Sequence, residues 1–459
     1  MNDGTFYCDG EYWSDLKELD QVKSPCAHLP LYKKIGGKGY CVLHYPGIGK
    51  TNAFKPALDA KLKAEDYNLR GVWFPEYTYF GRRCFQAGVD LTYAFFNDEA
   101  NFEICTFEKD AFFDKVTFNA DANFNGVSFN FFTSFFACSF RKSAIFHGAS
   151  FGDQLIKSKV TFFESIFEGK ADFSSTEFNC EAEFVSTTFN DSLLFDFASF
   201  TSNTDFNEAL FKDYVSFSGE YYKRRPIEGD EKINEVFGDE TSLNLQFAVF
   251  EKPERVSFHT TLLKPHWFVN TDCRKFEFTD IKWKHLAKNA NSVNDEIEDL
   301  TSRRYQNLGS PFELLAIANR RLALNSEENN RYEQASSFRY LAMDTHRLEK
   351  FGGFSPYTLT WWYWLLSGYG EEWKRAFAWL LGICLFWAFL YASPLSNFAD
   401  KHLYSFWYWF GYSLNIITLQ RPDPKPASTL TMILTGLEVL FAPIQAALLI
   451  LAVRRKFMR

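Results

Sequence analysis

The chain lacks the residue groupings on which most enzymes are built. Its 459 residues include only eight histidines and nine cysteines, and no Ser/His/Asp arrangement, metal-hydrolase motif or pair of catalytic carboxylates stands out. Residues 44–51, HYPGIGKT, are similar to a phosphate-binding loop but lack its first glycine, and no βαβ pattern follows them. We therefore expect neither an enzyme nor a nucleotide-binding protein, and interpret residues 44–51 as a Gly/Pro turn.

A secretion signal is also missing from the start of the sequence. The first residues, MNDGTFYCDGEYWSD, are polar and acidic, whereas a signal peptide begins with basic and then apolar residues. The net charge of −8 would suit an acidic rod that imitates DNA, but a strongly apolar last fifth does not fit that function. We expect a cytosolic N-terminal part and no nucleic-acid partner.

Phenylalanine is abundant, with 53 residues, and it is regularly spaced. Between Phe96 and Phe217 a Phe returns after alternating steps of five and six residues, with one slot filled by Ile156. Neither a helix nor a strand has this period, so the chain must coil as a solenoid with one inward ring per face. Small residues two positions before most rings, such as Ala100 and Val116, predict a second, tightly packed inward column.

This spacing resembles the pentapeptide-repeat family, which implies a right-handed four-sided β-helix with the rings stacked inside. Strict five-residue steps occur in a second block, at Phe258, Leu263, Phe268, Cys273, Phe278 and Trp283. The charged segment before it, residues 218–255, is expected to be an inserted loop or short helix. The two blocks predict roughly six to seven coils. Such a rod binds or positions something and carries no chemistry of its own.

The last fifth of the chain contains two apolar runs long enough to span a bilayer. Residues 376–394 have no charge, and residues 430–453 have one. Basic residues precede the first run and follow the second, which places both termini on the cytoplasmic side of the cell (inner) membrane. An uncharged stretch at residues 403–419 is short for a span. We expect a half-helix that enters and returns, with its loop ending at residue 426.

The order of span, half-helix, loop and span resembles the pore module of the tetrameric potassium-channel superfamily. The resemblance implies a homo-oligomer, expected to be a tetramer, in a lipid bilayer. The pore-loop positions that it implies are Thr418, Leu419, Gln420, Arg421 and Asp423. Residues 420–424, which directly follow the half-helix, include no glycine, so potassium selectivity is not implied. The GYG sequence at residues 368–370 precedes the first span and is not interpreted as a filter.

A polar stripe runs along the second span. Thr435, Glu438 and Gln445 share one side of the predicted helix with Thr431 and Ala442, which suits a water-filled pore or a subunit interface. A carboxylate near the middle of a membrane is costly, so Glu438 suggests a functional site. Alternatively, Glu438 is protonated or bonded to Thr435 or a neighbouring helix and only stabilises packing.

Three cysteines and a histidine in the first 50 residues predict a metal site. Cys8, Cys26, Cys41 and His44 have the residue types of a structural zinc site, and disulfides are disfavoured in a reducing compartment. His28 could replace Cys8 as a ligand. The alternative is that the cysteines are buried free thiols, which are common.

The whole arrangement resembles a bacterial group of membrane pentapeptide-repeat proteins, including its EKPERVSF and FTDIKW segments. Two functions stay open. One is an oligomeric channel-like protein whose solenoid senses a partner or ligand, and the other is a membrane-anchored scaffold without conduction. The expected parts are a Cys/His module (1–50), a lead-in (51–95), the β-helix (96–217), the insertion (218–255), a last coil (256–285), cytosolic and interfacial helices (286–375), the spans (376–394 and 430–453), the half-helix and loop (403–426) and a basic tail (454–459).

Overall fold

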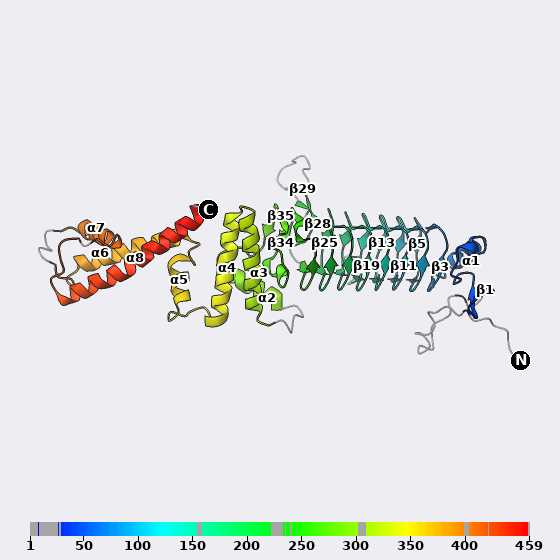
Figure 1. Ribbon diagram of the computed structural model, residues 1–459, viewed down its shortest axis with the longest axis horizontal. Helices are drawn as coiled ribbons and strands as arrows, with labels where there is room; N and C mark the ends of the chain where they lie inside the picture. Colours follow the sequence, from blue (N-terminus) through cyan, green and yellow to red (C-terminus); the bar gives the residue numbers. More distant parts are fainter. Residues whose placement is uncertain are drawn as a thin grey trace. The chain divides into compact units, whose positions relative to one another are not determined.

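The structure is a computed structural model that describes residues 8, 26, 29–153, 158–221, 233–234, 236–238, 241–301, 309–398, 404–420 and 422–457. The chain divides into two compact units, Met1–Lys284 and His285–Arg459. Short strands make up most of the first unit, and helices make up the second (Figure 1).

Four parallel sheets form the walls of a β-solenoid in the first unit, and successive strands of the chain go to different sheets. The first sheet contains β3 (Trp73–Phe74), β7 (Phe95–Phe96), β11 (Thr117–Phe118), β15 (Ser139–Phe140), β19 (Ile166–Phe167), β23 (Thr188–Phe189), β27 (Leu210–Phe211) and β32 (Val249–Phe250). The second contains β4 (Thr78–Tyr79), β8 (Ala100–Asn101), β12 (Ala122–Asn123), β16 (Ala144–Ile145), β20 (Ala171–Asp172), β24 (Leu193–Leu194), β28 (Val215–Ser218), β33 (Val256–His259) and β35 (Glu277–Thr279). The third contains β5 (Cys84–Phe85), β9 (Thr106–Phe107), β13 (Ser128–Phe129), β17 (Ser150–Phe151), β21 (Glu177–Phe178) and β25 (Ser199–Phe200). The fourth contains β6 (Val89–Asp90), β10 (Ala111–Phe112), β14 (Thr133–Ser134), β18 (Lys159–Thr161), β22 (Glu181–Glu183), β26 (Asn203–Asp205) and β31 (Ser242–Asn244).

Stacked phenylalanine rings fill the interior of the solenoid. Trp73 pairs with Phe95, and Phe95 with Thr117, in keeping with turns of ~22 residues. The rings of Phe102 and Phe124 in successive turns are parallel, with centroids 4.9 Å apart. The small column is also buried, as at Ala122. The structure therefore confirms the solenoid and the inward positions predicted from the Phe spacing.

Residues with a left-handed backbone conformation explain why the spacing between successive rings alternates between five and six residues. Every second corner is a tight β-turn whose third residue has a positive φ, such as Ile104 (54°) and Lys115 (56°). The amide of Cys105 donates to the carbonyl oxygen of Phe102 at 3.1 Å and closes one of these turns. A corner with such a turn takes a step of five residues from one ring to the next, and the other corners take a step of six. The two kinds of corner alternate around the coil.

Two details of the expected coiling are wrong. Thr133 pairs with Val160, so this turn is longer than its neighbours, and the additional residues come at the corner between β17 and β18. Ile156 falls outside the described residues. The pairing of the strands shows that the inward residue of the face after Phe151 is Phe162 rather than Ile156. The second half of the expected insertion is also a coil, because β31 and β32 belong to two of the walls.

The solenoid has about nine turns between residues 73 and 283, more than expected. The regular Phe spacing starts at Phe96, but β3 to β6 already form coils around Phe74, Phe80 and Phe85. In the strict five-residue block, Ser257 pairs with Glu277, so this turn is shorter than those before it. The shorter turn follows from four faces that all use the five-residue step.

Short elements flank and connect the coils. An antiparallel pair, β1 (Leu31–Ile35) and β2 (Lys38–Cys41), precedes the 3-10 helix η2 (Ile48–Lys50) and helix α1 (Thr51–Lys63). Later elements are the pair β29 (Glu220–Tyr221) and β30 (Ile233–Asn234), the pair β34 (Leu262–Leu263) and β36 (Lys282–Trp283), and the 3-10 helices η3 (Pro253–Arg255) and η4 (Pro265–Phe268).

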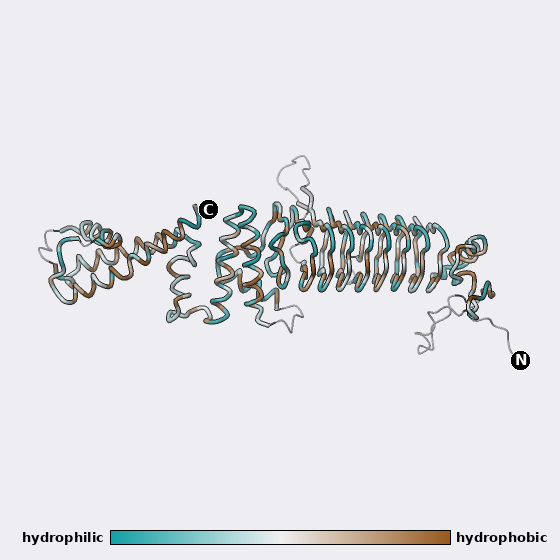
Figure 2. The backbone as a smooth tube through the Cα atoms, viewed as in Figure 1, coloured by the Kyte–Doolittle hydropathy of each residue, from teal (hydrophilic) through white to brown (hydrophobic). Residues whose placement is uncertain are grey.

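The second unit consists of two groups of helices. Helices α2 (Ala290–Thr301), α3 (Pro311–Glu328) and α4 (Tyr332–Phe351) pack around a core that includes Leu315, Leu341 and Tyr369. Helix α5 (Leu359–Ser367) leads to α6 (Trp373–Ala392), α7 (Phe406–Ile417) and α8 (Thr429–Phe457), whose shared core is mainly aromatic. Helices α6 and α8 are long and apolar enough to cross a membrane, and apolar residues run along both (Figure 2).

Candidate functional site

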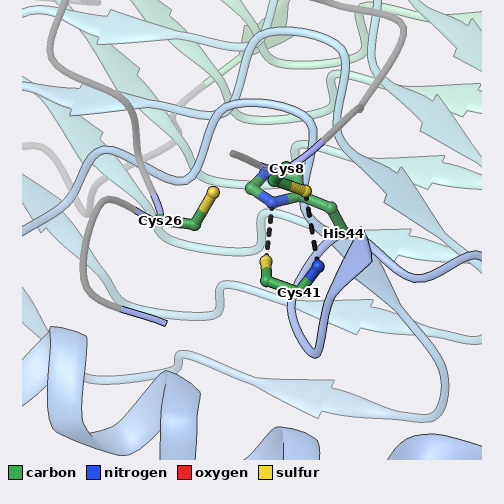
Figure 3. Close-up of side chains that lie close together, drawn as sticks. All are labelled: Cys8, Cys26, Cys41 and His44. Atoms are coloured by element: carbon green, nitrogen blue, oxygen red, sulfur yellow. Dashed lines mark hydrogen bonds between the residues drawn. The ribbon is translucent and has the colours of Figure 1, made fainter. Parts of the chain in front are cut away.

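The four residues predicted to bind metal lie together. Cys8, Cys26, Cys41 and His44 are buried, and their ligand atoms all lie within 4.8 Å of one another (Figure 3). None of the three cysteines is in a disulfide. Zinc binds sulfur at about 2.3 Å and imidazole nitrogen at about 2.0–2.1 Å in tetrahedral sites, so four donors this close fit around one ion. His28 lies outside the described residues.

The backbone around β2 fixes two of the donors. Cys41 ends β2, and the turn after it, closed by a bond from the amide of Tyr45 to the carbonyl oxygen of Cys41 (3.0 Å), brings His44 back beside Cys41. His44 Nε2 is 2.9 Å from the carbonyl oxygen of Arg70, and its Nδ1 is 3.0 Å from Cys41 Sγ. The Arg70 carbonyl requires a proton on Nε2, which leaves Nδ1 as the ligand atom.

Hydrogen bonds within the cluster favour a thiolate. Bonds from Cys26 and Cys41 hold the pKa of the Cys8 thiol well below its usual range, and the amide of Cys41 also donates to Cys8 Sγ at 3.4 Å. The pKa of Cys41 is raised by its bonds to Cys26 and Cys8. A thiolate is the form of cysteine that binds metal, so the cluster has the chemistry of a cation site.

Lys50 lies buried near this cluster and is the lysine of the HYPGIGKT segment. Its Nζ donates to the carbonyl oxygen of Leu43 at 2.8 Å and lies 4.7 Å from the ring centroid of Phe54. Burial lowers the pKa of Lys50 to about 7, although the charges of Cys41 and Cys8 oppose this shift. The ammonium therefore points into the protein rather than towards a phosphate. Zn²⁺ with three thiolates and a neutral imidazole has a net charge of −1, which a charged Lys50 would balance.

Replacing Lys50 with methionine is expected to weaken zinc binding tenfold or more. Two charges several ångströms apart in a partly buried site interact by about 1–4 kcal/mol, and about 1.4 kcal/mol is a factor of ten. Competition with a chromophoric chelator measures the affinity. Lys55→Met on the exposed side of α1 is the matched control and should bind zinc like the wild type. Equal affinities of Lys50→Met and the wild type would show that the charge of Lys50 has no role.

In the helical hairpin, Glu438 is enclosed by its own chain. The side chain is fully buried, and its carboxylate accepts hydrogen bonds from the hydroxyls of Tyr391 on α6 and Ser413 on α7. Gln445 Nε2 donates to the carbonyl oxygens of Ala376 (2.8 Å) and Leu366 (3.1 Å). These bonds correspond to the packing role that the sequence left open for Glu438.

The remaining residues of the polar stripe have partners in a neighbouring segment or within α8 itself. Thr431 Oγ1 accepts from the amide of Asn397 at 2.7 Å, and Thr435 Oγ1 donates to the carbonyl oxygen of Thr431 at 2.9 Å. Ala442 is fully buried. Thr431, Glu438 and Gln445 therefore bond to neighbouring segments of the same chain, whereas Thr435 bonds within α8.

Helix α7 packs against both α6 and α8. Ser413 is bonded to Glu438 well inside α8, and Ile416 belongs to a cluster that includes Ile383 from the middle of α6. In the segment after α7, the carbonyl oxygen of Asp423 accepts a hydrogen bond from the Tyr408 hydroxyl at 2.7 Å. Pro426 forms an isolated β-bridge with Phe398. Helix α7 thus lies within the expected segment 403–426, and its role as a half-helix that enters a membrane and returns stays a prediction.

The inner end of α7 exposes polar side chains. Asn415, Thr418 and Gln420 are exposed there, and we call these three residues the α7 tip; Leu419, an apolar residue between them, is also exposed. Arg421, the next predicted pore position, lies outside the described residues. The GYG sequence is elsewhere: Gly368, Tyr369 and Gly370 have positive φ angles and form the turn between α5 and α6. Tyr369 is buried, and its hydroxyl donates to Asp344 at 2.9 Å.

Sequence reasoning missed Lys50 and the three cations that bond to Glu371, which are Lys288, Arg339 and Arg455. The sequence pattern around Lys50 does not indicate where its side chain points. The cations lie far apart along the chain, so no local motif contains them. Comparison of the chain with protein family models, with curated proteins and with solved structures gives no match.

Proposed function

We propose that the chain is a membrane protein whose helices α6, α7 and α8 assemble as a homo-oligomer, expected to be a tetramer, into a channel-like pore. Both termini would lie on the cytoplasmic side of the cell membrane, and the solenoid would sense a partner or ligand. The observation that supports this proposal best is the polar α7 tip, located partway along two apolar helices.

The side-chain amides of Asn415 and Gln420 are costly for a single hairpin in lipid, whereas the Thr418 hydroxyl donates to the carbonyl oxygen of Asn415 at 2.8 Å. Polar groups that contact hydrocarbon without hydrogen-bond partners cost several kcal/mol each, so irregular backbone at this depth occurs where protein or water covers it. A ring of hairpins would surround the tips with water at its axis. One chain with two spans cannot enclose such a space alone.

The outward surfaces of α6 and α8 suit lipid or neighbouring copies. Both helices expose large apolar side chains at several successive turns, at Phe377, Leu381, Leu385, Phe386 and Phe389 on α6 and at Met432, Ile433, Leu437, Leu440, Phe441 and Ile444 on α8. A soluble protein rarely leaves so much contiguous apolar surface in water. The absence of glycine from residues 418–424 gives no carbonyl ladder of the potassium-channel kind, so the conducted ion is left open.

Gln420→Lys is the direct test of the pore. Purified oligomer in planar bilayers should pass single-channel currents, and a ring of added positive charges at the tip should reduce cation conductance severalfold or shift selectivity towards anions. Gln86→Lys, an exposed change on the solenoid, is the control and should leave currents unchanged. Currents that respond equally to both variants would place the pore elsewhere, and verified oligomer that never conducts would exclude a channel.

A second function is a membrane-anchored scaffold without conduction. The bonds of Glu438, Thr431 and Gln445 within one chain favour it, because the Glu438 carboxylate, the Thr431 hydroxyl and Gln445 Nε2 have partners without a second copy. A monomeric, non-conducting hairpin in bilayers would support this function.

We also infer that the Cys/His cluster holds a structural zinc ion. Three sulfurs and one imidazole nitrogen fill all four positions of a tetrahedral ion, whereas a catalytic zinc keeps one position for water. The ion would join Cys8 and Cys26 to the turn after β2, close to the first coils.

A further inference from the structure

A cavity of about 660 Å³ lies between the start of α4 and the end of α8. Lys288, before α2, and Glu371, between α5 and α6, complete its wall. All of these residues belong to the helical unit. The cavity is large enough for a ligand the size of a phosphorylated head group.

Positive charge dominates the wall. Four cationic side chains, Lys288, Arg331, Arg455 and Lys456, line it together with two carboxylates, Glu333 and Glu371. The difference of four and two leaves a net charge of +2. The ion pair between Lys456 and Glu333 (3.2 Å) is exposed, and such pairs contribute little. An anion could therefore replace it at small cost.

Glu371 does not neutralise the whole wall, because it is already shared. Its buried carboxylate accepts from Arg455 at 3.1 Å and also from Arg339 at 2.9 Å, which lies outside the cavity. Lys288 Nζ donates to the Ser336 hydroxyl at 2.7 Å and to the carbonyl oxygen of Glu371 at 3.3 Å. Burial lowers the pKa of Lys288, against the opposing charges of Glu371 and Glu372, so a nearby anion would favour its charged form.

The first turn of α4 adds further donors. Tyr332, Glu333 and Gln334 begin this helix of 20 residues and line the cavity, and no side chain caps the helix at Arg331. The first amides of a helix have no partner within the helix, and the helix dipole attracts anions to this end. Lysine and arginine charges beside unbonded amides are the groups that bind phosphate in proteins.

We propose that this cavity binds a phosphate-bearing anion, either the head group of an anionic lipid or a soluble phosphorylated compound. The lipid source is within reach, because the cavity lies at the basic end of α8, directly after its apolar residues. A bound phosphate would connect α4 with α8, and so join the cytosolic helices to the hairpin. Binding needs no conduction, so it can be tested even if the channel proposal fails.

The test measures ligand binding to the full-length protein in detergent. Native mass spectrometry and thermal melting are followed with short-chain phosphatidylglycerol, with phosphatidylcholine of the same chain length, and with inorganic pyrophosphate. We expect an anionic probe to bind and raise the melting temperature, whereas phosphatidylcholine does neither. Binding of phosphatidylglycerol alone identifies a lipid site, and binding of pyrophosphate identifies a soluble ligand.

Variants of the wall separate this site from general attraction to anions. Lys288→Gln and Lys456→Gln should each weaken binding about tenfold, as loss of one charge-assisted hydrogen bond does. Arg454→Gln is the matched control, because Arg454 is exposed beside Arg455 on the same helix but does not line the cavity. Lys288→Arg, which keeps the charge, should retain binding. Equal losses in Arg454→Gln and the two wall variants, or no binding of any anionic probe, would overturn the proposal.

Discussion

Replacing Phe173 with alanine is expected to lower the free energy of unfolding by about 3–5 kcal/mol, the range for a buried phenylalanine. Its ring is fully buried and stacks between those of Phe146 (4.7 Å) and Phe195 (5.2 Å) in the adjacent turns. The rings of Phe162 and Phe184 contact it edge-on, at 5.5 Å and 5.7 Å. The variant leaves a cavity that close-packed walls cannot fill. Chemical denaturation followed by circular dichroism measures the change.

Phe197→Ala is the matched control, because the same atoms are removed from a residue that is 46% exposed. Phenylalanine and alanine both have a Cβ atom, so the positive φ at position 197 (61°) strains the wild type and the variant alike. We expect a loss below about 1 kcal/mol, as for most surface substitutions. Similar losses in the two variants would mean that the assignment of inward and outward residues is wrong.

The second large effect is expected at the metal cluster. Protein purified without chelators should contain about one zinc per chain, and Cys41→Ser should lose it, because structural zinc sites depend on all their ligands. Amides of β1 and β2 should then exchange hydrogen much faster, since Cys41 ends β2 and its own amide bonds to Cys8. Elemental analysis and hydrogen exchange measure the two results.

Cys84→Ser serves as the control for the metal experiment. Cys84 is an exposed free cysteine on β5, outside the cluster, so this variant should keep both the zinc and the slow exchange. Wild-type protein that contains no zinc, or Cys41→Ser protein that retains a full equivalent, would contradict the site.

The solenoid was predictable because its coiling is recorded directly in the spacing of one residue type. Each turn places a ring at every face, and Phe occupies almost all of these positions between Phe96 and Phe217. The Phe spacing does not reveal a coil in which another residue type occupies the inward position. Leu245 is buried in the coil that the sequence assigned to an insertion, and an isolated leucine carries no periodic signal.

Sites formed by distant residues were predictable only in part. The residue types of Cys8, Cys26, Cys41 and His44 identified the cluster, since few other pairings of these types exist near the start of the chain. Glu438 was identified from its cost in a membrane, but its partners lie on α6 and α7, so the sequence could not choose between pore and packing. The cavity around Lys288 and Lys456 depends on tertiary packing and has no local pattern.

The length of one turn restricts how this protein can be lengthened or shortened during evolution. Duplication or loss of one complete turn changes the rod by about 4.8 Å, the spacing of neighbouring strands, and keeps every remaining ring above another. Most other changes within a wall would turn polar side chains inward. Insertions at a corner do not have this effect. The turns from Thr133 to Val160 and from Leu210 to Val249 are longer than the regular turns, yet the strands on either side keep their register. Selection can therefore vary the reach of the rod in whole turns and its surface loops freely.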